Sequence, residues 1–521
     1  MKVLFIKQHS NSVFFLTLGS MALGFMWLLR NSTLNGSGLI NDSIAYIAGA
    51  RSILAGTGYS QVWLATELQP ITHYPPLFSL VLSFVGLFGV DPLLSARMVN
   101  TLLLGVNIVL TGILGWRIFE DRFAGFLLAF LFTISGAIFR VHSYAISEPL
   151  FLFFCLAGFL FLEFHFMNRG KVWIVCLGIT VGLAILDRYV GFVLFGVIAA
   201  VLVLFENTWR SRLKGLGIYL ISSAPLPFAW LIYNFTLTGI MADRGLNWHP
   251  VTTENLLLGI ANFSHWLLPM DGLEADQIMF FLPGAFLLIS FGSLLLVWLV
   301  VGTVRMLKGL SSSLHLNPVV YTAGAFAWIY PLSVLISISL FDPTTKLQDR
   351  ILTPAYLSLM IVLVGFGIWL WRLGKPMVRA FAIFAGILLL GFWSRDFHQT
   401  VQSMQRDGQG YASRRIRESS VIRFIDEIPW NIAIYTDSPP SIYSGTGRPS
   451  FVVSLGSEEE QHLKYYLLIN EKIRSGEATL VLFDTNKYHD PVSQANYHML
   501  TMGSKMIIKF GTQRAFMGEE E

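Results

Sequence analysis

KVWIVCLGITVGLAILDRYVGFVLFGVIAAVLVLF (171–205) is the stretch that decides the fold class. Two apolar runs flank the polar tripeptide Asp187-Arg188-Tyr189. A helix needs about 20 residues to cross the hydrocarbon core of a bilayer. The stretch therefore predicts two membrane helices, 172–187 and 189–205, with a tight polar turn between them.

The composition of the whole chain points to the same class. Of 521 residues, 54% are hydrophobic and 13% are charged, about half of the roughly 25% charged fraction of soluble domains. This excludes a soluble globular enzyme of this size, and it excludes a disordered chain, which has the opposite composition. The formal net charge, 36 − 32 = +4, gives no basic surface for nucleic acid.

Apolar windows of spanning length recur along the chain and predict eleven transmembrane helices. The first window follows Lys2 and Lys7, which is also typical of a signal peptide, but we expect a retained helix because many spans follow. The windows are 13–30, 97–116, 122–139, 149–167, 172–187, 189–205, 216–235, 277–302, 318–341, 351–371 and 376–394.

The distribution of positive charges predicts the topology. A twelfth apolar segment, 75–90, is short and begins with two prolines. If it does not cross, fourteen Lys and Arg residues face one side and only Arg140, Arg188, Lys346 and Arg350 face the other, as the positive-inside rule requires. We therefore expect 75–90 to be an interfacial helix, with the N-terminus in the cytoplasm. The fourteen are Lys2, Lys7, Arg117, Arg122, Arg169, Lys171, Arg210, Arg212, Lys214, Arg305, Lys308, Arg372, Lys375 and Arg379.

This topology predicts two domains. Residues 1–394 form a transmembrane domain with two large external loops, 31–96 and 236–276. Residues 395–521 form a small soluble α/β domain outside the membrane, since the apolar runs shorten there. Four short runs are typical of strands and one charged segment, 458–476, is typical of a solvated helix. The strand-like runs are 431–439, 450–456, 478–486 and 505–511.

Ionisable side chains gather at the predicted outer ends of the helices, where a functional role competes with a local structural one. Asp42 begins an amphipathic segment, so it is either a helix N-cap or a functional carboxylate. Glu148 precedes Pro149 and either complements a helix dipole or lines a site. Arg188 is either a hairpin tip or a phosphate ligand, and Arg350 repeats the pattern.

Aromatic residues of the second external loop leave two interpretations open. The loop contains Trp248, His249, Trp266 and Asp271. These residues either select the acceptor, since aromatic side chains stack on sugar rings, or belong to an interfacial aromatic belt.

Several of these motifs, in this order, resemble the polytopic membrane glycosyltransferases of the GT-C class. They are the first-loop Asp42, the Tyr-Pro-Pro-Leu-Phe turn (74–78), Glu148-Pro149, Arg188-Tyr189 and Arg-x-Leu-x-Pro-Ala-Tyr (350–356). The similarity covers roughly residues 10–395 and is greatest to the bacterial branch related to protein O-mannosyltransferases and lipid A aminoarabinose transferase.

The resemblance implies roles for individual residues. Asp42 matches the catalytic base and Glu148 an acid of the same cavity. His73 and Tyr74 stand where some members have a lysine on the lipid phosphate, and Arg188 takes over that role. The donor-phosphate set is then Arg188, Arg350, His73 and Tyr74, and the acceptor or sugar set is Tyr46, Tyr189, Trp248 and His249.

The predicted function is transfer of a hexosyl or pentosyl group from a polyprenyl-phosphate donor to a lipid, glycan or protein acceptor at the extracytoplasmic face. It proceeds by a single inverting displacement with Asp42 as general base. The membrane lipids solvate the donor's prenyl tail. No cofactor is required by the pattern, although carboxylates at 42 and 148 offer oxygen ligands for a divalent cation. The alternative is a lipid or solute transporter or flippase, which would carry its charges at the bilayer midplane.

Overall fold

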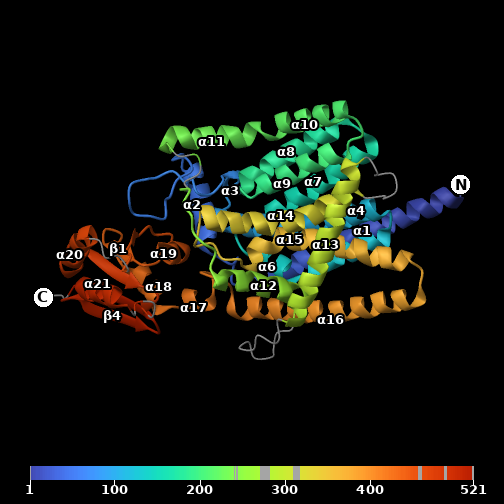
Figure 1. Ribbon diagram of the computed structural model, residues 1–521. Coiled ribbons are helices and arrows are strands. Elements are labelled where there is room, and N and C mark those ends of the chain that lie inside the picture. The colour runs from blue at the N-terminus through green and yellow to red at the C-terminus, as the bar shows by residue number, and fades with distance from the viewer. Residues whose placement is uncertain are drawn as a thin grey trace. The chain divides into compact units, whose positions relative to one another are not determined.

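The computed structural model describes residues 2–239, 241, 245–269, 282–308, 317–455, 460–485, 488 and 490–518 (Figure 1). These residues form two compact units. The first comprises Met1–Ser32, Thr72–Phe78 and Met98–Ser403, and the second comprises Thr33–Ile71, Ser79–Arg97 and Met404–Glu521. The second unit thus combines most of the predicted first external loop with the C-terminal region. The predicted domains, divided at residue 394, assign the loop to the transmembrane domain instead.

Long helices build the first unit, and each of the eleven predicted windows falls on helix, with residues 277–281 outside the described residues. The helix of 253–267 was not predicted. The helices are α1 (Lys2–Ser32), α4 (Pro92–Phe119), α5 (Arg122–Ile134), α6 (Gly136–Ser143), α7 (Glu148–Asn168), α8 (Lys171–Asp187), α9 (Gly191–Phe205), α10 (Trp209–Ser223), α11 (Pro225–Thr238), α12 (Thr253–Leu267), α13 (Leu282–Leu307), α14 (Pro318–Leu340), α15 (Asp349–Arg372) and α16 (Pro376–Asp407).

The helices establish a multi-pass membrane protein. Within the described residues, seven helices are long and apolar enough to cross a membrane, and up to nine do so if each of two bent pairs is one span. Helices α8 and α9 have 17 and 15 residues, fewer than the about 20 that a full crossing takes. The total of eleven spans therefore stays a prediction.

Two of the expected spans are broken. Helices α5 and α6 bend by 61° and α10 and α11 by 44°. The first break lies at Ser135, whose backbone is extended. The second lies at Pro225, the first residue of α11, because proline lacks the N–H that would continue the ladder of α10.

The helix ends of the first unit fall into two groups, and helix ends of the same group contact one another. In one group, Arg372 Nη2 donates to the carbonyl oxygen of Phe119 at 3.1 Å, and Asn317 Nδ2 donates to Glu163 at 3.4 Å. In the other group, the ends at 140–148, 187–189 and 349–350 meet. The charge count separates the same two groups, so these contacts support the predicted alternation of helix direction.

The C-terminal region contains a mixed sheet. Its five described strands run in the order β2-β1-β3-β5-β4. β1 is parallel to both β2 and β3, and β5 is antiparallel to both β3 and β4. The four predicted runs contain β1 to β4, whereas β5 was missed because its polar start continues the turn after Gly511. The strands are β1 (Ala433–Thr436), β2 (Phe451–Val452), β3 (Ala478–Leu482), β4 (Lys505–Phe510) and β5 (Gln513–Met517).

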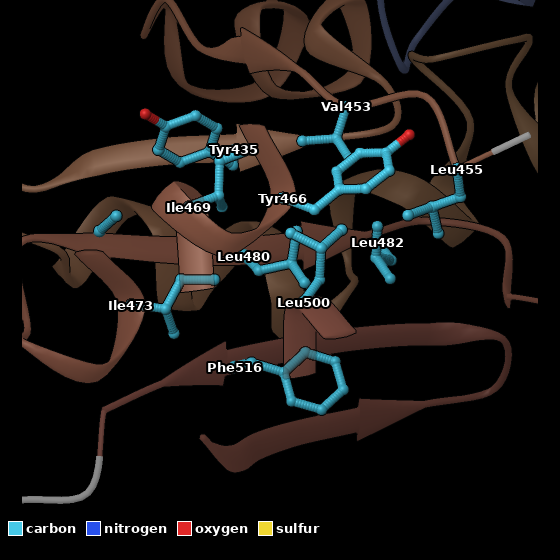
Figure 2. Packing of buried hydrophobic residues seen from close by; sticks show 11 residues of the cluster. Tyr435, Val453, Leu455, Tyr466, Ile469, Ile473, Leu480, Leu482, Leu500 and Phe516 are labelled. Carbon is cyan, nitrogen blue, oxygen red and sulfur yellow. The ribbon is translucent and has the colours of Figure 1, made fainter. Parts of the chain in front are cut away.

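Helices cover this sheet and form two apolar cores. Figure 2 shows the first core, in which Tyr466, Ile469 and Ile473 pack with strand residues that include Leu480 and Phe516. The neighbouring strand residues Val481 and Ala515 belong to the second core, as the alternation of a strand requires. The helices are α17 (Arg414–Arg417), α18 (Ser420–Glu427), α19 (Pro439–Thr446), α20 (Glu460–Arg474) and α21 (Pro491–Thr501). The predicted helix 458–476 corresponds to α20, with 458–459 outside the described residues.

The first-loop segments of the second unit contain α2 (Asn41–Leu54) and most of α3 (Leu77–Gly86), the latter within the expected interfacial segment 75–90. Backbone bonds join this loop to the C-terminal region. Tyr411 N–H donates to the Leu39 carbonyl at 2.8 Å, and Ala65 N–H donates to the Ser450 carbonyl at 3.1 Å. An apolar cluster of Ile44, Ala48 and Tyr443 lies between them. The C-terminal region therefore holds the start of α2 in place.

Gly410 is a test of this junction. Its φ is +55°, and an added Cβ would collide with the carbonyl oxygen of Leu39. Gly410→Ala combines left-handed strain of about 1–2 kcal/mol with overpacking of about 1–3 kcal/mol. We expect faster proteolysis between residues 33 and 71 and a lower thermal midpoint. Gly511→Ala is the matched control, because Gly511 has φ +56° with open space around it. Equal effects of the two substitutions would contradict the junction.

Candidate active site

Glu148 is the centre of a buried charge cluster in the first unit. It begins α7, and 1% of its side chain is exposed. Its Oε1 lies 2.9 Å from Arg188 Nη1 and 3.2 Å from Arg350 Nη1. A carboxylate removed from water keeps its charge only when cations pair with it. The structure thus brings together three of the predicted site residues from three separate segments of the chain.

The contacts of Arg188 bear on its two interpretations, and its role as a phosphate ligand stays a prediction. It follows α8 directly with an extended backbone, as a residue in a tight connection does. Its side chain is 17% exposed, and Nη1 also donates to Ser147 Oγ at 3.1 Å. A hairpin tip made polar for water would point outward. The inward guanidinium instead favours a functional residue.

A second polar cluster adjoins the first through the start of α15. Arg140 Nη1 lies 3.5 Å from Asp349 Oδ2, and Arg140 Nη2 donates to Thr400 at 3.1 Å. Tyr356 OH donates to Asp349 Oδ1 at 3.0 Å. Because Asp349 and Arg350 are consecutive, this network fixes the first turn of α15 and with it the backbone of Arg350.

Tyr189 links the hairpin to the proline turn. Its hydroxyl donates to the Thr72 carbonyl at 3.1 Å, and Trp230 Nε1 donates to the same hydroxyl at 3.1 Å. Thr72 precedes His73 and Tyr74, whose rings meet edge to face at 4.8 Å. The structure therefore places this turn beside Tyr189, the neighbour of Arg188 in the chain.

Asp42 belongs to the second unit and is the second residue of α2. The N-cap residue is Ile40, whose N–H donates to Ser43 Oγ at 3.1 Å. The interpretation of Asp42 as the N-cap is therefore wrong, because Ile40 occupies the N-cap position and Asp42 lies inside the first turn of the helix. The functional interpretation of this half-buried carboxylate remains.

Tyr411 is a residue that sequence reasoning missed beside Asp42. Its hydroxyl donates to Asn41 Oδ1. Burial raises the pKa of Tyr411, a hydrogen bond with Ser438 opposes the rise, and the charges of Asp42 and Asp437 add to it. The phenol therefore stays protonated at neutral pH and remains a hydrogen-bond donor at the start of α2.

The predicted acceptor residues lie in different surroundings. Tyr46 is buried, 2% exposed, and its carbonyl accepts from Ser79 Oγ at 3.0 Å. Trp248 is exposed, and backbone bonds from Asn247 and His249 reach Leu340 and Ser339 at the end of α14. The sugar-binding roles of Tyr46, Trp248 and His249 stay predictions.

Trp266 has neither of its expected roles. It lies on α12, is 5% exposed, and stacks on Tyr356 with ring centroids 4.8 Å apart. Its indole N–H donates to Ser135 Oγ at 3.3 Å. Trp266 is therefore a core residue and not part of an exposed sugar platform or an aromatic belt. Asp271 lies outside the described residues.

Asp187 was missed as a member of the site. The sequence treats it as part of a polar turn, yet the side chain is fully buried. Among the described residues, neither of its carboxylate oxygens has a hydrogen-bond partner, and Glu148 Oε2 is in the same situation. The charge of Asp187 interacts with Arg188 and Glu148. Buried polar atoms are nearly always paired in proteins, so these oxygens call for an explanation such as a catalytic role or a bound partner.

Metal ligands do not cluster in the described part of the chain, where no group of three or more His, Cys, Asp or Glu side chains is arranged to hold an ion. A divalent cation on Asp42 and Glu148 therefore stays a prediction.

Solved structures share this fold over nearly the whole chain. ArnT from Cupriavidus metallidurans bound to undecaprenyl phosphate is 15% identical, with 96% of this chain and 97% of that chain covered and a TM-score of 0.57. A second structure is that of the archaeal oligosaccharyltransferase AglB from Archaeoglobus fulgidus in complex with an inhibitory peptide and a dolichol-phosphate. It is 12% identical, with 98% of this chain and 75% of that chain covered and a TM-score of 0.51. The mycobacterial arabinofuranosyltransferase AftD is 14% identical, with 97% of this chain and 42% of that chain covered and a TM-score of 0.50.

The chain therefore has the GT-C fold, and the resemblance to GT-C glycosyltransferases is confirmed. The family model of dolichyl-phosphate-mannose-protein mannosyltransferases matches residues 53–240. This range contains Glu148 and Arg188. No curated protein sequence matches the chain significantly.

Removal of the Glu148 charge tests the cluster. Glu148→Gln leaves two partly buried guanidiniums without their counter-ion, and we expect a loss of about 3–5 kcal/mol in stability. Thermal unfolding in detergent, followed by intrinsic fluorescence, measures the change. Glu418→Gln is the control, because Glu418 pairs with Arg414 on the surface, where such pairs contribute little. A Glu148→Gln protein as stable as the control would contradict the assignment.

Proposed function

We propose that the protein transfers a sugar from a polyprenyl-phosphate donor to an acceptor at the extracytoplasmic membrane surface. The observation that carries the proposal is the pair of guanidiniums, Arg188 and Arg350, held by one buried carboxylate in a GT-C fold. Two of the structures with this fold contain a polyprenyl or dolichyl phosphate. Their common ligand suggests the donor class for this chain.

Arg188 and Arg350 are suited to the leaving phosphate. Glu148 contacts Nη1 of each residue, and a guanidinium has five N–H donors in a planar fork. The contacts with Glu148 therefore hold both planar guanidiniums in a defined orientation. Positive charge that is already oriented stabilises the phosphate as the bond to the sugar breaks. In this proposal Glu148 orients the two arginines toward the donor phosphate.

Asp42 acts as general base in this proposal. The acceptor oxygen or nitrogen forms a bond to the anomeric carbon, and its proton passes to Asp42. The bond between that carbon and the phosphate oxygen breaks, and its electron pair leaves with the polyprenyl phosphate. A single displacement inverts the anomeric centre. A positioned carboxylate contributes about 10²–10⁴-fold to such a step.

The remaining residues bind the two substrates. His73 and Tyr74 lie on a turn that Tyr189 fixes through Thr72, and we assign this turn to the donor head group. Tyr46, Tyr189, Trp248 and His249 are assigned to the sugar or the acceptor. The active site and the C-terminal region face the extracytoplasmic side in this proposal, as the charge count predicts. A transporter is less favoured, because the charges gather at one group of helix ends and not at mid-span.

Asp42→Asn tests the base. The amide keeps the size of the side chain but cannot accept a proton, so we expect transfer of a labelled sugar from polyprenyl phosphate in proteoliposomes to fall about 10²-fold or more. Asp121→Asn is the matched control, because Asp121 caps α5 through the Phe123 N–H at 2.9 Å and asparagine caps equally well. Asp42→Asn turnover equal to that of the control would remove Asp42 from the base role.

Arg188→Gln and Arg350→Gln test the phosphate ligands. Loss of one oriented donor is expected to lower kcat/KM for the donor about 10²-fold or more, with little change in KM for the acceptor. Lys346→Gln provides the control, since Lys346 is an exposed cation on the loop before α15. Donor kinetics that are unchanged in both arginine variants would refute the phosphate role.

A further inference from the structure

A cavity of about 440 Å³ lies within the second unit, and no residue of the Glu148 cluster lines it. Its wall combines the segment before α2, the first turn of α4, and helices α17 to α19. This volume falls within the about 300–1,000 Å³ of ligand sites. Tyr411 lines it, but none of the residues that we assign to the base, the donor or the acceptor does.

The cavity is rich in positive charge. Arg97, Arg417 and Arg423 line it, together with Asp91 and Asp426. Asp91 is engaged by Arg51, with Nε and Nη2 at 3.1 and 3.0 Å from its two oxygens, so it offers little charge to the cavity. The three arginines then exceed the one remaining carboxylate by two charges.

Hydrogen bonds orient two of the three guanidiniums. Arg97 Nε donates to Thr33 Oγ1 at 3.2 Å, and Arg417 Nη2 donates to Asn35 Oδ1 at 2.7 Å. Both arginines therefore present their planar forks in defined orientations, as recognition of phosphate or carboxylate requires.

Apolar side chains form the rest of the wall. They include Leu93, Leu94, Ile416 and Ile422, and Leu94 is 51% exposed. Leu87 and Phe88, which precede this segment in the chain, are 73% and 75% exposed, as expected of side chains in contact with lipid near the predicted interfacial helix. The wall therefore suits a ligand with an anionic head and a hydrocarbon chain.

We propose that this cavity binds an anionic amphiphile, with a phosphate head on Arg97, Arg417 and Arg423 and the first part of an alkyl chain on Leu94 and Ile416. A free phosphate would leave the apolar wall in water, and a zwitterionic head would bring a cation to the arginines. A phosphate-bearing lipid at the membrane surface satisfies both halves of the wall.

Titration calorimetry of the full chain in maltoside micelles tests the proposal, with dodecyl phosphate, dodecylphosphocholine and inorganic phosphate as probes. Arg417→Gln/Arg423→Gln is expected to weaken dodecyl phosphate binding about tenfold or more. Arg414→Gln/Arg415→Gln is the control, because it removes two exposed charges from α17 that do not line the cavity. The unmodified protein and both double variants keep Arg188 and Arg350. Any dodecyl phosphate bound at those two residues therefore contributes equally to all three titrations.

A second variant keeps the test independent of folding in the first. Leu94→Glu places a negative charge beside the arginines on an already exposed position, and it should weaken dodecyl phosphate binding as well. Equal binding by the test and control pairs would overturn the proposal. If inorganic phosphate bound as tightly as dodecyl phosphate, the proposed binding of the alkyl chain would be wrong. If dodecylphosphocholine bound with equal affinity, the proposed selection for an anionic head group would be wrong. Sugar transfer is not measured, so the result stands apart from the proposed function.

Discussion

The buried carboxylate of Glu148 is the constraint on which the site depends. An isolated charge at the end of an apolar helix is costly, and here two guanidiniums from distant segments compensate for it. The same contacts fix the start of α7, the turn between α8 and α9, and the start of α15. One electrostatic requirement thus holds these three segments together and orients two cations of the kind that recognises a phosphate.

Most of the helical architecture could be predicted from the sequence, because a bilayer restricts the length of its helices and the side on which positive charges lie. The lengths of the apolar runs located the helices. The charge asymmetry divided the helix ends into two groups, and the structure shows contacts within each group. Pro225 and Ser135 broke two spans that length alone treats as continuous. Burial of Trp266 against Tyr356 could not be foreseen, because periodicity does not reveal which helix covers an aromatic residue.

Candidate residues were predictable where the side chain was chemically out of place. Glu148, Arg188 and Arg350 stood at span ends, and geometry brought them together. Asp187 was missed, since a polar turn explained it without reference to burial. Tyr411 was missed because it lies 369 positions after Asp42, and only tertiary structure joins the C-terminal region to the start of α2. The cavity with Arg97, Arg417 and Arg423 was hidden for the same reason.

The most direct measurement is an experimental structure of the protein with a polyprenyl-phosphate analogue in a lipid nanodisc. Our account predicts the phosphate within hydrogen-bond distance of both Arg188 and Arg350, with Glu148 still in contact with the two guanidiniums and the prenyl chain leaving toward lipid. A phosphate bound elsewhere, with the guanidiniums turned away from it, would contradict the account.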